Sequence, residues 1–140
     1  MTTIAYKDGV IAYDSRVTDN GRIADDDCDK KLVVNGVSFF ITGCFTDAEK
    51  LIDVYFDRKP HRYVDCRAIV LDDGELSECG VAPKGGFWKY KMRLDNPAAI
   101  GSGADFAMAA MTLGHSAEQA VELAAKLDSC TGGRIRYWRL

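Results

Sequence analysis

The sequence predicts an α+β domain made mainly of antiparallel hairpins, with amphipathic helices packed against them. Tight-turn pairs of the Asp-Gly or Asn-Gly type lie between apolar runs, which is the strongest local signal for a hairpin. Three other segments repeat apolar residues at helical intervals. The 140 residues are 47% hydrophobic and 28% charged, the balance of a globular protein, and suit one domain over residues 1–140.

Each of three turn motifs separates two runs of strand-forming residues. The predicted hairpins are 2–7 with 10–15 around Asp8-Gly9, 28–34 with 37–42 around Asn35-Gly36, and 65–71 with 75–81 around Asp72-Asp73-Gly74. Two more strands are predicted over 86–92 and 134–139. Strands joined by short turns pair in antiparallel sheets. The acidic stretch 25–27 is expected to be a solvated loop. A calcium-binding loop is the alternative, and the ligand spacing does not match one.

Three helices are predicted from apolar spacing and capping motifs. The first begins at Thr46, where Thr46 and Glu49 have the spacing of a capping box. The second ends at Gly114, and the third opens with a further capping box, Ser116 and Gln119. The expected buried positions are Ala48, Leu51, Ile52 and Tyr55, then Ala104, Ala107, Met108 and Met111, then Ala120, Val121, Ala124 and Leu127. These stripes indicate core packing, and no cofactor is expected.

The helices need a sheet face to cover. Two stacked antiparallel sheets with helices outside would provide it, and so would a simpler two-layer α+β fold. The pattern alone does not choose between them.

Composition limits the partners. The net charge of −3 argues against nucleic acid as the main partner, and no apolar run approaches the ~20 residues that span a bilayer. Five cysteines without a Cys-x-x-Cys pair fit a reducing compartment, and the N-terminus lacks the features of a secretion signal. A cytoplasmic location is therefore expected, with no membrane and no nucleic acid as partner.

The first residues carry chemistry if Met1 is removed. Thr2 would then bear a hydroxyl nucleophile and a free α-amine, whose ordinary pKa is ~7.7–8.0. One residue would so hold a nucleophile and its own general base. An ordinary strand start is the alternative.

The hairpin places a carboxylate at the same end. If Asp8 and Gly9 are the turn residues, Asp14 lies across from Thr3 and diagonal to Thr2. Lys30-Lys31 precedes the apolar run Leu32-Val33-Val34. A lysine paired there with a carboxylate would be a fixed positive charge that favours a deprotonated hydroxyl and lowers the pKa of a nearby amine.

Five segments, in this order from end to end of the chain, resemble segments of proteasome β subunits and of the bacterial HslV peptidase. They are Thr2-Thr3-Ile4-Ala5 with Gly9 to Thr18, Lys30-Lys31-Leu32, Thr42-Gly43-Cys44-Phe45-Thr46-Asp47, Gly101-Ser102-Gly103, and Asp128-Ser129-Cys130-Thr131-Gly132-Gly133. Each motif is weak alone, and their joint order is specific. The resemblance implies the N-terminal nucleophile (Ntn) hydrolase fold, a four-layer α-β-β-α sandwich of two antiparallel sheets flanked by helices.

The resemblance also implies a threonine-type endopeptidase. The implied catalytic residues are Thr2, Asp14, Lys31, Gly43, Ser102, Asp128 and Thr131, and the implied substrate-binding residues are Val17, Ile41 and Phe45. Thr2 would be the nucleophile, Lys31 would stabilise its oxygen and Asp14 would orient Lys31. The N–H of Gly43 would form the oxyanion hole, while the remaining three would hold the Thr2 amine.

The sequence departs from the family pattern in three places. The opening hairpin is shorter than in typical relatives, and Cys44 replaces the usual second glycine after Gly43. The segment between Asp57 and Asp65 is too short for the second helix of relatives, which contributes to ring packing.

Three functions fit the resemblance. The first is a peptidase that acts on peptides or unfolded proteins inside a homo-oligomeric ring, with an ATP-dependent unfoldase as partner. The second is a hydrolase of small amides, and the third is a non-catalytic assembly protein that keeps only the fold. Single residues also have structural alternatives: an ion pair for Asp14 and Lys31, a helix N-cap for Ser102, the end of a helix for Asp128, and a plain turn for Thr131.

Overall fold

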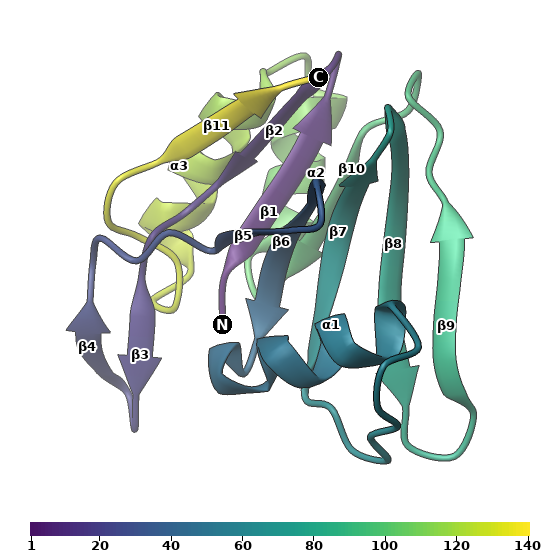
Figure 1. Cartoon of the computed structure of the whole chain (residues 1–140). Coiled ribbons are helices and arrows are strands. Elements are labelled where there is room, and N and C mark those ends of the chain that lie inside the picture. Colours follow the sequence, from purple (N-terminus) through teal and green to yellow (C-terminus); the bar gives the residue numbers. More distant parts are fainter. The chain divides into compact units, whose positions relative to one another are not determined.

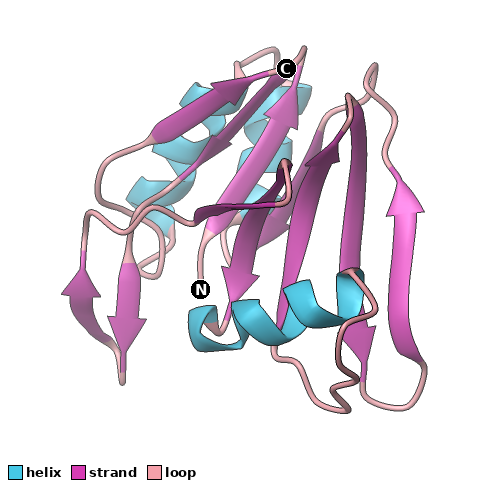
Figure 2. Cartoon of the chain, viewed as in Figure 1, coloured by secondary structure: helices cyan, strands magenta, loops and turns pink.

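The structure is a computed structural model that describes residues 1–140, and these divide into two units. The first unit holds Met1–Lys30 and Arg93–Leu140, and the second holds Lys31–Met92. The α+β class, with antiparallel sheets and three α-helices, is confirmed (Figure 2). The single domain over 1–140 and the stacking of four layers stay predictions. None of the helices has the length and the apolar composition that crossing a bilayer requires.

The first unit contains a four-stranded antiparallel sheet with two helices on one face. In sheet order, its strands are β10 (Ala98–Gly101), β1 (Thr3–Lys7), β2 (Val10–Tyr13) and β11 (Arg136–Arg139). The helices α2 (Ala104–Thr112) and α3 (Ala117–Leu127) lie side by side on this sheet (Figure 1). Small residues such as Ala5, Ala12 and Ala120 are fully buried between them, so helix and sheet approach closely.

The sequence analysis did not predict three strands of this unit, β3, β4 and β10. β3 (Val17–Asp19) and β4 (Arg22–Asp25) form a separate two-stranded ribbon, where the sequence analysis predicted no strand. Its turn is Asn20-Gly21, with φ of 50° and 77°. Both values are positive, as a two-residue hairpin turn of type I′ requires.

The second unit is a five-stranded meander with one helix. Its strands, in sheet order, are β5 (Lys31–Val34), β6 (Val37–Gly43), β7 (Cys66–Asp72), β8 (Glu75–Ala82) and β9 (Gly86–Lys91). A short 3₁₀ turn, η1 (Phe45–Asp47), leads into α1 (Ala48–Tyr55). Leu51 and Ile52 of α1 pack against the sheet residues Phe39, Ile41 and Val70.

The three predicted hairpins are confirmed, although several strand boundaries differ from the predicted ones; β2, for example, ends at Tyr13 rather than at residue 15. Asp8-Gly9, Asn35-Gly36 and Asp73-Gly74 all have positive φ at both turn residues. The first arm of the second hairpin begins at Lys31 rather than at residue 28.

Two details of the predicted helices are wrong. Thr46 does not cap α1: it lies inside η1, and its hydroxyl contacts the Cys44 thiol instead. Leu127 is 59% exposed rather than buried, because it is the last residue of α3. The capping box of α3 is confirmed: Ser116 accepts from the Gln119 N–H, and the Gln119 side chain accepts from the Ser116 N–H.

Candidate active site

The opening hairpin brings Thr2 and Asp14 together, as its turn predicted. Ile4 pairs with Tyr13 and Ala5 with Ala12, so paired positions sum to 17. The N–H of Asp14 donates to the carbonyl of Thr3 at 3.3 Å. The carboxylate of Asp14 therefore lies at the end of the hairpin where β1 begins.

The hydroxyl of Thr2 lies between a carboxylate and an ammonium. Thr2 Oγ1 donates to Asp14 Oδ1, and Lys30 Nζ donates to Thr2 Oγ1. Lys30 Nζ also donates to Asp14 Oδ1 at 2.9 Å, and the side chains of this ion pair are 4% and 0% exposed. Burial lowers the pKa of Lys30, and the nearby charge of Asp14 opposes that shift. An ammonium that is poorly hydrated and close to a hydroxyl stabilises negative charge on its oxygen.

The lysine at Thr2 is Lys30, where the motif comparison predicted Lys31. Lys30 is the last residue of the first unit, directly before β5, and Lys31 is the first residue of β5 in the second unit. Consecutive residues of an extended chain point to opposite sides, so a shift of one residue exchanges their roles. The contact with Thr2 that was predicted for Lys31 is made by Lys30, and the catalytic role of this lysine stays a proposal.

Backbone donors hold the carboxylate of Asp14 in place. Asp14 Oδ1 accepts from the N–H of Thr3 at 3.2 Å. Asp14 Oδ2 accepts from the N–H of Gly132 at 2.9 Å and of Arg16 at 3.3 Å. The sequence analysis did not identify the Gly132 contact, although its Gly-Gly motif marks a place of close backbone approach.

A second polar cluster surrounds Asp128, at the end of α3. Asp128 Oδ2 accepts from Ser102 Oγ at 2.6 Å and from Thr131 Oγ1 at 2.7 Å, and Oδ1 accepts from the N–H of Cys130 at 3.1 Å. Burial raises the pKa of Asp128, but the hydrogen bonds from Ser102 and Thr131 outweigh it, and the pKa is lowered overall. The positive charge of the chain's N-terminus lowers the pKa of Asp128 further.

The two clusters are joined through the residues on either side of the Thr2–Thr3 bond. Ser102 Oγ lies 3.4 Å from the carbonyl oxygen of Thr2, which accepts its hydrogen bond. The hydroxyls of Thr3 and Thr131 are 2.8 Å apart. Gly103 allows this approach, because a Cβ there would overlap the hydroxyl of Thr3. The structure thus brings together Thr2, Asp14, Ser102, Asp128 and Thr131 in the first unit.

Of the remaining predicted site residues, Val17 lies in the first unit, and Gly43, Ile41 and Phe45 lie in the second. Gly43 ends β6 in the second unit, with φ of 103°, and a Cβ there would lie 2.7 Å from the carbonyl of Asp65. Only glycine fits that position, and its role in an oxyanion hole stays a prediction. Of the predicted substrate-binding residues, Ile41 is buried beneath α1, whereas Val17 and Phe45 are partly exposed.

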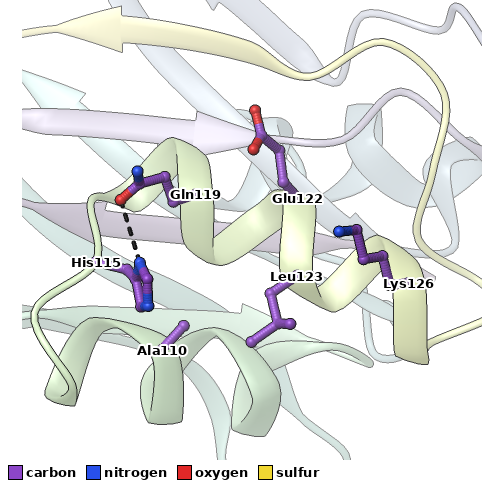
Figure 3. A pocket seen from close by; sticks show the side chains of 6 residues that line it. All are labelled: Ala110, His115, Gln119, Glu122, Leu123 and Lys126. Atoms are coloured by element: carbon purple, nitrogen blue, oxygen red, sulfur yellow. Dashed lines mark hydrogen bonds between the residues drawn. The ribbon is translucent and has the colours of Figure 1, made fainter.

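A separate hollow of about 240 Å³ lies between α2 and α3, on the side of α3 that faces away from the sheet (Figure 3). His115 and Gln119 approach each other across it at 3.4 Å. None of the predicted site residues lines it.

Solved structures of proteasome-like Ntn hydrolases match nearly the whole chain. HslV from Trypanosoma brucei matches with a TM-score of 0.73 and 20% identity, over 98% of this chain and 97% of that one. BPH from Thiobacillus denitrificans in complex with epoxomicin matches with a TM-score of 0.72 and 19% identity, over 99% and 97%. A second structure of BPH from Thiobacillus denitrificans matches with a TM-score of 0.69 and 20% identity, over 99% of this chain and 96% of that one. No protein-family profile and no curated protein matches the chain.

These likenesses establish the fold. The chain has a divergent HslV-like fold, that of the proteasome-like Ntn hydrolases which its motifs resemble. At 19–20% identity the comparisons carry no activity over to this chain.

Proposed function

We propose that this chain is a threonine-type peptidase whose nucleophile is Thr2, exposed as the N-terminal residue by removal of Met1. The observation that carries the proposal is the buried hydroxyl of Thr2, which contacts both the Asp14 carboxylate and the Lys30 ammonium. A buried ion pair placed on one hydroxyl has a chemical use when that hydroxyl reacts.

The reaction begins with attack by Thr2 Oγ1 on the carbonyl carbon of a peptide bond. The free α-amine of Thr2 accepts the hydroxyl proton, directly or through a water molecule. Lys30 stabilises the oxygen as it gains negative charge, and Asp14 orients Lys30. Hydrogen bonds within the Asp128 cluster, which includes Ser102 and Thr131, hold the amine.

The tetrahedral intermediate then collapses. The C–N bond breaks, the leaving amine takes the proton from the Thr2 ammonium, and the acyl group remains on Oγ1 as an ester. A water molecule, deprotonated by the same α-amine, hydrolyses the ester and restores Thr2. In the family pattern, the N–H of Gly43 donates to the oxyanion, an effect of ~3 kcal/mol per donor. Val17 and Phe45 are the candidates for contact with an apolar side chain of the substrate.

The proposed working form is a homo-oligomeric ring that encloses the sites, supplied with unfolded protein by an ATP-dependent unfoldase. HslV and proteasome relatives form oligomeric rings, and the HslV-like fold supports a ring here. The short segment between α1 and β7 holds no helix, so a ring of this chain packs without the helix that relatives have there.

One experiment separates this function from its two alternatives. Protein produced in cells is analysed by intact mass, by hydrolysis of fluorogenic peptides, and by labelling with epoxomicin, the compound present in the BPH complex. Loss of Met1, peptide hydrolysis and a covalent adduct together support the peptidase. The Thr2→Ala variant should still lose Met1 but should show neither peptide hydrolysis nor an adduct. Loss of Met1 with hydrolysis of small amides alone supports the small-amide hydrolase. Retained Met1 without any adduct supports the non-catalytic protein.

A further inference from the structure

Arg16 joins three segments of the first unit. Its Nε and Nη2 donate to the two carboxylate oxygens of Asp26 at 2.8 and 3.2 Å, and its Nη1 donates to the carbonyl of Ser129 at 3.1 Å. The Arg16 side chain is 20% exposed. A two-point contact between guanidinium and carboxylate fixes direction as well as distance. Asp26 therefore determines where the guanidinium of Arg16 lies.

The same guanidinium packs against a donor to Asp14. A Cβ at Gly132 would lie 2.6 Å from Arg16 Nη2, so the guanidinium rests directly on the glycine. Gly132 and Arg16 supply the two backbone N–H groups that donate to Asp14 Oδ2. A displacement of the Arg16 side chain would therefore disturb the carboxylate that holds Lys30.

The segment that contains Asp26 also leads to Lys30. The N–H of Cys28 donates to the carbonyl of Ser15 at 3.0 Å, and the N–H of Arg134 donates to the carbonyl of Asp26 at 3.3 Å. Asp27 Oδ1, next along the chain, accepts from Arg134 Nη2 at 2.7 Å and from Arg136 Nη2 at 3.0 Å. The chain is thus attached to Ser15, which follows β2, and to the C-terminal segment just before it reaches Lys30.

We propose that Asp26 is a positioning residue of the Thr2 site. Through Arg16 it fixes Gly132 and hence Asp14, and through its own segment it fixes the approach of Lys30 to Thr2. The acidic stretch is therefore more than a solvated loop. The inference rests on the proposed function, because the reaction that it supports is hydrolysis by Thr2.

The test compares Asp26→Asn with the matched variant Asp95→Asn. Asp95 makes the same two-point contact with Arg93, at 3.0 and 2.8 Å, and both side chains are exposed and belong to no part of the site. Asp26→Asn is expected to lower kcat for peptide hydrolysis about tenfold or more, with KM within about twofold, because the catalytic groups are misplaced while substrate contacts remain. Asp95→Asn should match the wild type, and Asp26→Glu should restore part of kcat.

The pH profile separates positioning from general weakening of the fold. The charged and titratable groups that act on the Lys30 ammonium are Asp14, Asp26, Arg16 and Cys28. Loss of the Asp26 charge disfavours the ammonium, so the alkaline limb of kcat should move to lower pH in Asp26→Asn. It should stay in place in Asp95→Asn. A change that only weakened the fold would lower Tm and leave this limb where it is.

Two results would overturn the inference. One is an Asp26→Asn enzyme with the kcat and the alkaline limb of Asp95→Asn. The other comes from a measurement that needs no activity, an NMR titration of the Lys30 side chain: an equal pKa of Lys30 in Asp26→Asn and Asp95→Asn counts against positioning. If the wild type hydrolyses nothing but the pKa of Lys30 falls only in Asp26→Asn, the proposed function fails and the positioning role stands. Arg16→Lys, which keeps the charge and loses the two-point contact, serves if Asp26→Asn does not fold.

Discussion

Two adjacent lysines allow a sharp test of the site, because the structure shows Lys30 in contact with Thr2 where the motif predicted Lys31. Lys30 Nζ donates to Thr2 Oγ1 and to Asp14 Oδ1, and its side chain is 4% exposed. Lys30→Met keeps an unbranched side chain of similar length and removes the charge. Asp14, whose side chain is 0% exposed, then stays buried without its cation.

The expected loss follows from that burial. Removing one partner of a buried ion pair costs about 3–5 kcal/mol of unfolding free energy, because the other charge is left uncompensated. Asp14 keeps three backbone N–H donors, from Thr3, Arg16 and Gly132. The loss should therefore lie near the lower end, at about 3 kcal/mol. Lys91→Met, which removes one side of an exposed pair 3.4 Å from Glu75, should cost less than about 1 kcal/mol.

Urea unfolding followed by circular dichroism measures both losses. Asp14→Asn and the double variant Asp14→Asn/Lys30→Met complete a double-mutant cycle. Each single variant leaves one charge of the pair buried alone, whereas the double variant removes both charges. The two single losses should exceed the double loss by about 1–3 kcal/mol. Additive losses, or a Lys30→Met protein as stable as Lys91→Met, would refute the buried pair.

The same variants test the assignment between the two lysines. Under the proposed function, Lys30→Met should lower kcat about 10²–10³-fold, since it removes the charge beside the reacting oxygen. Lys31→Met should lower it far less. A larger loss in Lys31→Met, measured with the same fluorogenic peptide, would restore the assignment made from the motif.

Three further predictions concern the fold and the packing around the site. Ser116→Ala should cost about 1 kcal/mol in urea unfolding, because it removes a formed helix cap, whereas Thr46→Ala should stay within about 0.5 kcal/mol. Gly103→Ala should lower stability by about 1–3 kcal/mol and reduce Tm, because its methyl group overlaps the Thr3 hydroxyl. Burial raises the pKa of the Cys79 thiol from its ordinary value of 9.0 to about 12. As pH rises above 9.0, the thiol ionises in the unfolded chain but stays neutral in the folded one, so the free energy of unfolding falls. Cys79→Ala should flatten the decline in unfolding free energy between pH 9 and 11 by about 1.4 kcal/mol per pH unit.

Turn chemistry made the hairpins predictable, and its incomplete use explains the missed ribbon. Asp8-Gly9 and Asn35-Gly36 were identified because apolar runs flank them. Asn20-Gly21 adopts the same turn, with φ of 50° and 77°. Its flanking strands β3 and β4 are partly or fully exposed along their length, so they lack the apolar pattern that identifies a strand beside a core. The Asn-Gly pair alone was a sufficient signal for the turn.

The site likewise contains residues that the sequence could predict and residues that it could not. Asp14 was predictable, because a two-residue turn sets the register of a hairpin and hence the residue opposite Thr3. Lys30 was not, since no turn links it to Thr2, and two identical adjacent residues give sequence comparison nothing to distinguish. The hydrogen bond from Gly132 to Asp14 and the one from Thr131 to Asp128 depend on how the chain bends after α3, which backbone-permissive glycines leave open.

The Met1–Thr2 peptide bond explains why such a site can form before it can act. The nitrogen of Thr2 is an amide in the chain as it stands, and an amide nitrogen has no basic lone pair with which to accept the hydroxyl proton. The hydroxyl already contacts its carboxylate and its ammonium, and Thr2 is 1% exposed while Met1 is 60% exposed. Removal of Met1 would therefore supply the missing base, the free α-amine of Thr2. Under the proposed function, folding of the first unit places the hydroxyl, its carboxylate and its ammonium together, and that one cleavage supplies the base.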